Sequence, residues 1–339
     1  MKYTLLSIIL ICYNITYSQV QTFNYNGSDR QYTLHIPSNL PNDAPLVFVL
    51  HGYSGSANNI KNYSGMDQVA NNNNFAVCYP NGTRDQWNYR FWNVGYDFHQ
   101  NSTVDDIGFL IALAQYLQNE YQLSAEKTFS TGMSNGGDMS YLLACQASNI
   151  FSAVAPVAGC MMEWIQNSCS PSKPIPVLEI HGTNDNTTLW NGDMNNNDGY
   201  GAYLPTNDGI NFWVQLNNCT TLEIDTLLDL DPSDGSIVIT EKHKLGIENN
   251  QVWLYTILNG DHDWPGSYGN MDINSSEVIW DFFNQNINNA SNIIETNNNI
   301  EKKLLKQINI LGEEILKNYN GIIINIYTDG TTSKKMQLN

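Results

Sequence analysis

The stretch STGMSNGGDMS, residues 130–140, has a serine at the centre of a Gly-x-Ser-x-Gly pattern. The longer segment KTFSTGMSNGGDMSYLLACQAS (127–148) predicts a strand, a tight turn and a helix. On such a turn the serine is exposed on strained backbone, and the flanking glycines let the helix approach the strand. The pattern predicts that Ser134 is a nucleophile, with a polar residue in an ordinary glycine-rich turn as the alternative.

Apolar runs on both sides of this turn indicate the fold class. Further runs have the length and apolar character of buried strands: 45–52, 74–82, 151–159, 175–185 and 251–264. Helices are expected over 104–121 and near 274–285. Continuous apolar strands separated by helices imply a mostly parallel sheet covered on both faces. The sequence therefore predicts an α/β fold, whose reactive groups gather at the carboxyl ends of the strands.

A serine nucleophile needs a base, and the base needs a carboxylate that orients it. With a Gly-x-Ser-x-Gly turn the chain order is serine, acid, histidine. Among the histidines after the serine, His181 ends a strand, where packing or capping is expected, and His243 lies in the polar run TEKHK. His262 follows the strand-like run VWLYTIL in a loop, and we predict that it is the base.

The acid is expected in a loop that follows a strand between serine and histidine. Asp185 ends the run IPVLEIHGTND and fits this position. The remaining aspartates either lie in polar sequence with no strand to position them or flank the histidine too closely to orient it: Asp193, Asp198, Asp208, Asp261 and Asp263. We therefore predict Asp185 as the acid.

Ester or amide chemistry also needs donors for the oxyanion. One predicted donor is the backbone N–H of Asn135, at the positive end of a helix. The other is the backbone N–H of Tyr53, in the loop that follows the strand-like run LVFVLHG. In this interpretation His51 braces the loop, and a plain glycine-rich turn is the alternative.

Several blocks in order give the chain a resemblance to a known family: LVFVLHGYSGSA, YPNG, WN at 92–93, VDDIGFL, GMSNGGDMSYLLAC, FSAVAPVAG, PIPVLEIHGTND and GDHDWPG. They span about residues 45–266 and resemble exported esterases related to polyhydroxybutyrate depolymerase and feruloyl esterase. The resemblance implies the α/β-hydrolase fold and assigns Ser134, Asp185 and His262 as nucleophile, acid and base. The chain departs from the family pattern with NTTLW after the acid and with Asp261 where glycine is common.

The charge distribution limits the expected partners. Residues 19–299 hold eight Lys or Arg and 29 Asp or Glu, a net charge of −21, within a chain of net charge −18. A domain with this net negative charge repels nucleic acid and anionic membranes, so neither is an expected partner. No cysteine or histidine cluster has zinc spacing, and serine chemistry needs no cofactor, so none is expected.

The two ends of the chain differ from its body. Residues 1–18 have the basic start, the short apolar core and the small-residue end of a signal peptide, with a buried first strand as the alternative. The catalytic domain is expected over 19–286 and an Asn-rich linker over 287–299. Residues 300–339 resemble the end of a type IX secretion sorting tail, which implies recognition by secretion machinery. An ordinary small β appendage is the alternative. The protein is therefore expected to be secreted without a membrane anchor.

An exported chain permits disulfides, and five cysteines follow the signal peptide. We favour a bond between Cys145 and Cys169, with Cys160–Cys169 as a local alternative. Cys78 lies in an apolar run and is expected to be a buried thiol.

Aromatic residues crowd the loops expected near the site, including WNYRFWNVGYDF at 87–98. Trp92, Trp190 and Trp264 are predicted to contact substrate, with ordinary anchoring of loops into the core as the alternative. The expected activity is hydrolysis of feruloyl or acetyl esters of plant-type polysaccharide through an acyl-enzyme. A hydroxyalkanoate depolymerase is the second interpretation, and a peptidase that uses the same triad is the third. A non-catalytic carbohydrate-binding protein on a hydrolase scaffold is a distant alternative.

Overall fold

The computed structural model describes residues 20–298, 304–309, 312–315, 321–327 and 332–337. The signal peptide expected at 1–18 lies outside the described residues. The chain divides into two compact units, residues 1–286 and 287–339.

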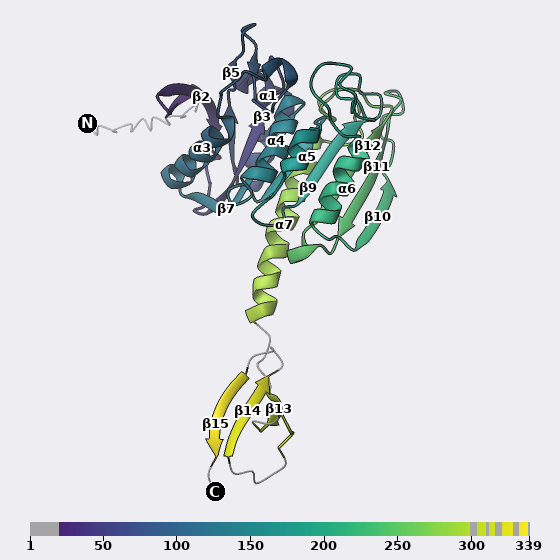
Figure 1. Cartoon of the computed structure of the whole chain (residues 1–339). Coiled ribbons are helices and arrows are strands. Elements are labelled where there is room, and N and C mark those ends of the chain that lie inside the picture. Colours follow the sequence, from purple (N-terminus) through teal and green to yellow (C-terminus); the bar gives the residue numbers. More distant parts are fainter. Residues whose placement is uncertain (1–19, 299–303, 310–311, 316–320, 328–331, 338–339) are drawn as a thin grey trace, which may run out of the picture. The chain divides into compact units, whose positions relative to one another are not determined.

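The first unit contains a ten-stranded sheet in the order β1-β2-β4-β3-β7-β8-β9-β12-β11-β10 (Figure 1). Its strands are β1 (Val20–Tyr25), β2 (Ser28–His35), β3 (Ala44–Leu50), β4 (Ala76–Pro80), β7 (Leu123–Met133), β8 (Ala153–Val157), β9 (Val177–Gly182), β10 (Thr221–Thr226), β11 (Ile237–Lys244) and β12 (Val252–Leu258). The inner strands from β4 to β12 pair in parallel. The strands at both ends of the sheet pair antiparallel. The predicted mostly parallel sheet is confirmed.

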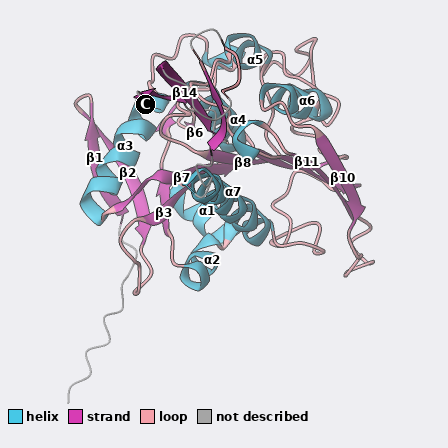
Figure 2. Cartoon of the chain, turned by 90° about the horizontal axis from the view of Figure 1, so that it is seen from below, coloured by secondary structure: helices cyan, strands magenta, loops and turns pink. Residues whose placement is uncertain are grey.

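Helices cover both faces of this sheet. They are α1 (Ala57–Ser64), α2 (Met66–Asn73), α3 (Asp106–Tyr121), α4 (Asn135–Gln146), α5 (Glu163–Ser168), α6 (Thr206–Leu216) and α7 (Ser275–Asn298). Figure 2 shows α4, α5 and α6 on one face and α1 and α2 on the other. The first part of α7 also packs on the sheet, because the Phe283 ring stacks on that of Phe129 in β7 with centroids 4.6 Å apart.

The inner strands are apolar along their whole length because both of their faces are covered. Every residue of β4, β8 and β9 is buried, as are all but one in β3. Full burial of one Val, Leu, Ile or Phe side chain stabilises the fold by roughly 1.5–3 kcal/mol. The interior of the sheet is therefore a rigid support for the loops at its carboxyl edge.

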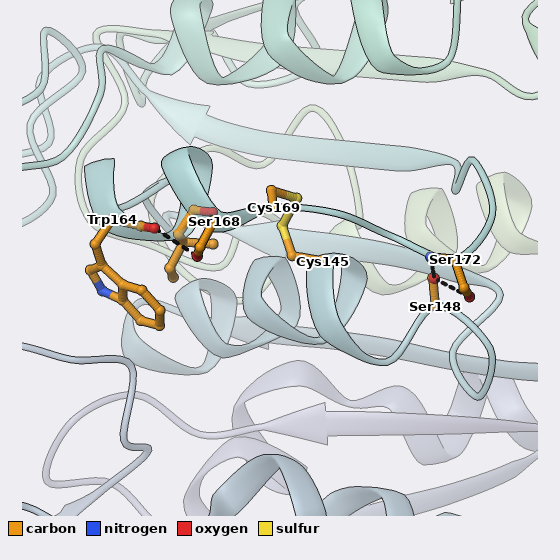
Figure 3. Close-up of a disulfide and its surroundings, with 7 residues drawn as sticks. Cys145, Ser148, Trp164, Ser168, Cys169 and Ser172 are labelled. Atoms are coloured by element: carbon orange, nitrogen blue, oxygen red, sulfur yellow. Dashed lines mark hydrogen bonds between the residues drawn. A yellow bond between two sulfur atoms is a disulfide. The ribbon is translucent and has the colours of Figure 1, made fainter.

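A disulfide joins the helix after the serine turn to the segment before β9. Cys145, near the end of α4, is bonded to Cys169, just after α5 (Figure 3). Ser148 Oγ accepts the Ser172 backbone N–H at 2.8 Å and lies 3.0 Å from the Ser172 hydroxyl, which makes a second connection. The favoured Cys145–Cys169 pairing is confirmed, and the Cys160–Cys169 alternative is wrong because Cys160 is a free thiol. Cys78 is a buried thiol, as predicted.

The end of the chain differs in part from the expectation. The sequence predicts a linker over 287–299, but α7 continues to Asn298. This segment contains neither glycine nor proline, so no residue in it interrupts the helix. The second unit contains a three-stranded antiparallel sheet of β13 (Leu304–Ile308), β14 (Gly321–Tyr327) and β15 (Thr332–Gln337). The small β segment expected at the end of the chain is therefore present, and its role as a sorting tail stays a prediction. Within the described ranges, no helix has the length and apolarity needed to cross a membrane.

Candidate active site

The serine lies on a sharp turn between β7 and α4. Ser134 has φ 55° and ψ −125°, a conformation that a non-glycine residue rarely adopts. Its neighbours are glycines because the chains touch there. A Cβ on Gly132 would lie 2.6 Å from the Gly136 carbonyl oxygen, and a Cβ on Gly136 would overlap the carbonyl oxygen of Leu50. The turn therefore presents Ser134, which is half-buried, where strand and helix meet most closely.

The predicted acid and base are hydrogen-bonded to each other. His262 Nδ1 lies 2.7 Å from Asp185 Oδ2, although the residues are 77 positions apart. The other carboxylate oxygen accepts the backbone N–H groups of Thr187 and Thr188 at 2.8 and 2.7 Å. The Asp185 side chain is fully buried, whereas that of His262 is 21% exposed. Asp185 is therefore fixed in place, and His262 presents part of its ring to the site.

The three predicted residues come from neighbouring parallel strands. Ser134 follows β7, Asp185 follows β9 and His262 follows β12, and these strands are linked through β8 in one parallel arrangement. Their carboxyl ends therefore meet at one edge of the sheet. Among the hydrogen bonds of the described residues there is none from Ser134 Oγ to the His262 imidazole. Catalytic hydrogen bonds are often long without substrate and shorten in the complex.

The predicted oxyanion donors lie on the two loops next to the serine. Asn135 is the first residue of α4, so its backbone N–H has no partner inside the helix. The loop that carries Tyr53 lies against the serine, since a Cβ on Gly52 would be 3.4 Å from Ser134 Cβ. The backbone hydrogen bonds of the described loops include none from the Tyr53 N–H. Both groups are therefore free to donate.

The buried side chain of His51 stabilises the loop after β3 that carries Tyr53, here called the oxyanion loop. Its Nε2 accepts the Gly82 backbone N–H at 3.0 Å, and its Nδ1 lies 2.7 Å from the Gly52 carbonyl oxygen, to which it donates. Burial lowers the pKa of His51 to about 4, so the ring is neutral near pH 7 with this arrangement of donor and acceptor. This geometry suits the bracing role that the sequence predicts for His51.

The side chain of Asn135 has a role that the sequence does not reveal. Its Oδ1 accepts the Trp92 backbone N–H at 2.7 Å, and its Nδ2 donates to the Trp92 carbonyl oxygen at 3.0 Å. The Trp92 indole N–H donates to the carbonyl oxygen of His51 at 2.9 Å. Asn135 and Trp92 are both fully buried. The residue beside the nucleophile therefore fixes the segment around Trp92, and Trp92 in turn supports the oxyanion loop.

Two of the three tryptophans predicted to contact substrate are buried. Trp92 and Trp264 are 0% and 1% exposed, and their indole N–H groups donate inside the protein, in the case of Trp264 to Ser276 Oγ. A ring without exposed surface cannot stack on a substrate, so these two predictions are wrong. Trp190 is half-buried, with its ring 5.9 Å from that of His181, and it stays a prediction.

A buried network of ionisable side chains adjoins the acid. His181 Nδ1 lies 3.0 Å from Glu179 Oε1, and Nε2 lies 2.8 Å from the Thr188 carbonyl oxygen and 3.5 Å from Asp185 Oδ2. Burial by itself would lower the pKa of His181, but its hydrogen bond with Glu179 and the nearby carboxylates raise it above the ordinary value. Burial raises the pKa of Glu179. The sequence gives one signal for this network, the alternation of Glu179 and His181 in an otherwise apolar strand.

A serine on the turn after one central strand, with an acid and a histidine after two later strands, is the arrangement of α/β-hydrolases. The solved structures agree with this class. The chain is similar to acetyl xylan esterase from Aspergillus awamori with a TM-score of 0.54 and 14% identity, over 78% of this chain and 99% of that one. The protein has the α/β-hydrolase fold.

The sequence comparisons are more specific. Residues 30–179 match the family model described as Esterase PHB depolymerase. Feruloyl esterase B of Piromyces equi is 26% identical over 197 residues, which are 56% of this chain and 36% of that protein. The bifunctional acetylxylan esterase/xylanase XynS20E of Neocallimastix patriciarum is 25% identical over 159 residues, 47% of this chain and 22% of that protein. The chain thus spans less than half the length of either relative. The family match contains Ser134 and ends before Asp185 and His262.

Proposed function

We propose that the protein is a serine esterase that hydrolyses carboxylic esters through an acyl-enzyme. The hydrogen bond of 2.7 Å between His262 Nδ1 and Asp185 Oδ2, at the sheet edge that carries Ser134, is the observation that supports this most strongly. It leaves Nε2 of the ring to accept a proton from the serine. Similarity to feruloyl and acetylxylan esterases also supports an ester as substrate.

The proposed reaction has two halves. His262 takes the Ser134 hydroxyl proton as Oγ attacks the ester carbonyl, and the buried Asp185 carboxylate stabilises the imidazolium. The N–H groups of Tyr53 and Asn135 hold the oxyanion. The alcohol leaves with the proton from His262, and an acyl-serine forms. Water, deprotonated by His262, then attacks the acyl-serine. The bond between the acyl carbon and Ser134 Oγ breaks, His262 returns the proton to Oγ, and the carboxylic acid is released.

The proposed substrates are feruloyl or acetyl esters of plant-type polysaccharide. A hydroxyalkanoate polyester is the second candidate, because the matching family model is described as Esterase PHB depolymerase. Each substrate brings neutral groups to the site, which suits a domain of high negative charge.

Export belongs to the same proposal. Residues 1–18 act as a signal peptide, and the C-terminal unit serves as a sorting tail read by secretion machinery. The three-stranded sheet of that unit supports a separate role for it, because its strands are distinct from the catalytic sheet. Deletion of residues 300–339 should abolish secretion and leave ester hydrolysis by the remaining protein intact.

Hydrolysis of p-nitrophenyl acetate by the wild type and by Ser134→Ala tests the activity. We expect turnover in the wild type and a loss of at least about 1000-fold in the variant. Methyl ferulate, acetylated xylan and hydroxybutyrate oligomers then separate the substrate classes. Equal turnover by the wild type and Ser134→Ala would show that Ser134 is not the nucleophile. Absence of turnover in both would favour a carbohydrate-binding protein on a hydrolase scaffold.

A further inference from the structure

Two aromatic rings project from the hairpin of β5 (Thr83–Arg84) and β6 (Arg90–Phe91). Trp87 and Tyr89 are each 51% exposed. The turn that carries them is held by Asp85, whose Oδ1 accepts the backbone N–H groups of both residues at 2.9 Å. Large rings exposed on a fixed turn suit contact with a flat, partly apolar ligand.

The same carboxylate connects the hairpin to the oxyanion loop. Asp85 Oδ2 accepts the hydroxyl of Tyr53, and the Tyr53 ring lies 5.7 Å from the Tyr89 ring between centroids. The backbone N–H of Ser54 donates to the carbonyl oxygen of Arg90 at 2.8 Å. The exposed rings are therefore held in a fixed position relative to one predicted oxyanion donor.

The other end of the hairpin is connected to the nucleophile turn. Trp92 follows Tyr89 by three residues and is hydrogen-bonded to the side chain of Asn135. Three extended residues span at most about 10 Å, so the Cα atom of Tyr89 lies within about 10 Å of the Cα atom of Trp92. The hairpin is therefore joined, within a few residues, to the turn that carries Ser134.

A surface hollow of about 340 Å³ lies beside the hairpin. Its lining includes neutral polar residues and two phenylalanine rings: Gln86, Asn101, Ser102, Thr103, Phe91 and Phe98. The Phe98 ring centroid is 6.0 Å from that of Trp87, so the hollow continues from the exposed rings.

The charged residues Arg84 and Asp85 in this lining both make hydrogen bonds to neighbouring protein groups. Arg84 donates to the Asn88 carbonyl oxygen at 2.6 Å, and both oxygens of Asp85 accept hydrogen bonds. An anionic ligand would also be repelled by the net charge of the domain. Sugar rings present apolar C–H faces and hydroxyl edges, and they match exposed aromatic rings next to uncharged polar groups.

We propose that Trp87 and Tyr89, here called the hairpin aromatic pair, bind neutral sugar rings of the polysaccharide that carries the ester. This inference rests on the proposed function and assigns the alcohol side of the substrate to the hairpin. The pair stacks on sugar units away from the scissile bond, so it strengthens the binding of long substrates more than that of small esters.

Binding can be measured without turnover in the Ser134→Ala protein, by calorimetric titration with acetylated xylo-oligosaccharides. We expect the dissociation constant to rise by about tenfold when Trp87→Ala and Tyr89→Ala are both added to this protein. Tyr116→Ala is the matched control, since Tyr116 is 39% exposed on α3, and it should bind like the parent. Restored binding with Trp87→Phe and Tyr89→Phe supports stacking. Equal affinity with and without the pair, or tighter binding of hydroxybutyrate oligomers that depends on the pair, would overturn the proposal.

Kinetics provide an independent measurement in protein with Ser134 intact. The ratio of kcat/KM for acetylated xylo-oligosaccharide to that for p-nitrophenyl acetate should fall about tenfold without the pair. An unchanged ratio would overturn the proposal. A wild type that hydrolyses no ester contradicts the proposed function, whereas the titration still reports whether the pair binds sugar.

Discussion

Replacing Asn135 by alanine removes the side chain that joins the nucleophile turn to Trp92 and keeps the backbone N–H at position 135. Both hydrogen bonds that are lost, of 2.7 and 3.0 Å, are buried. The Trp92 N–H and carbonyl groups are then left without a partner, and each such group costs roughly 1–3 kcal/mol. We expect the free energy of unfolding to fall by about 3 kcal/mol.

The same variant should be a slower catalyst, because Trp92 also supports the loop that carries Tyr53. A displacement of about 1 Å near the reacting groups can lower the rate about 100-fold. We therefore expect kcat for p-nitrophenyl acetate to fall by about 10- to 100-fold, with the donor N–H at 135 still present.

Urea unfolding and steady-state kinetics measure the two effects. Asn217→Ala is the matched control: Asn217 is buried at the end of α6, and its Nδ2 donates to the Ile175 carbonyl oxygen at 2.9 Å. It should lose similar stability and keep kcat. Wild-type kcat in Asn135→Ala, or an equal loss of kcat in Asn217→Ala, would refute the positioning role.

Three further changes have defined outcomes. Cys145→Ser with Cys169→Ser opens a link of sequence separation 24, and the free energy of unfolding should fall by about 3 kcal/mol; wild-type stability in calorimetry would contradict this. Gly136→Ala forces a methyl group against the Leu50 carbonyl and should destabilise the protein by about 3 kcal/mol or more, so an unchanged melting temperature would argue against the close approach. Burial raises the pKa of Asp138 from 3.8 to about 6, so the native state keeps a proton that the unfolded state releases. The free energy of unfolding of the wild type, compared with that of Asp138→Asn, should therefore fall by on the order of 2 kcal/mol as the pH rises from about 4 to 6. Parallel curves of unfolding free energy against pH for the two proteins would be inconsistent with this.

Sequence alone predicts the central strands well, and the physical reason is burial. Strands covered on both faces, such as β8 and β9, are continuous apolar runs that stand out from loops. The strands at both ends of the sheet were not predicted as part of it, because they are partly or fully exposed; every residue of β10, for example, is exposed. A strand of this kind has no continuous apolar run to mark it.

Site residues that directly follow a strand could be predicted from the sequence. Residues whose burial depends on contacts with distant parts of the chain could not. Asp185 and His262 could be chosen because each follows an apolar run. Trp87 and Trp92 stand in one short segment, yet one is exposed and the other buried. That difference arises because the segment is bonded to Asn135, 43 residues further along the chain. No local pattern records such a contact.

Covalent labelling tests the central claim most directly. A fluorophosphonate reacts with serines that have been activated by a base, and intact-protein mass spectrometry followed by peptide mapping locates the adduct. We predict one adduct per chain, on Ser134, and much slower labelling in His262→Ala and Asp185→Ala. An unlabelled wild type, an adduct on another residue, or labelling of the two variants at the wild-type rate would contradict the proposed catalytic arrangement.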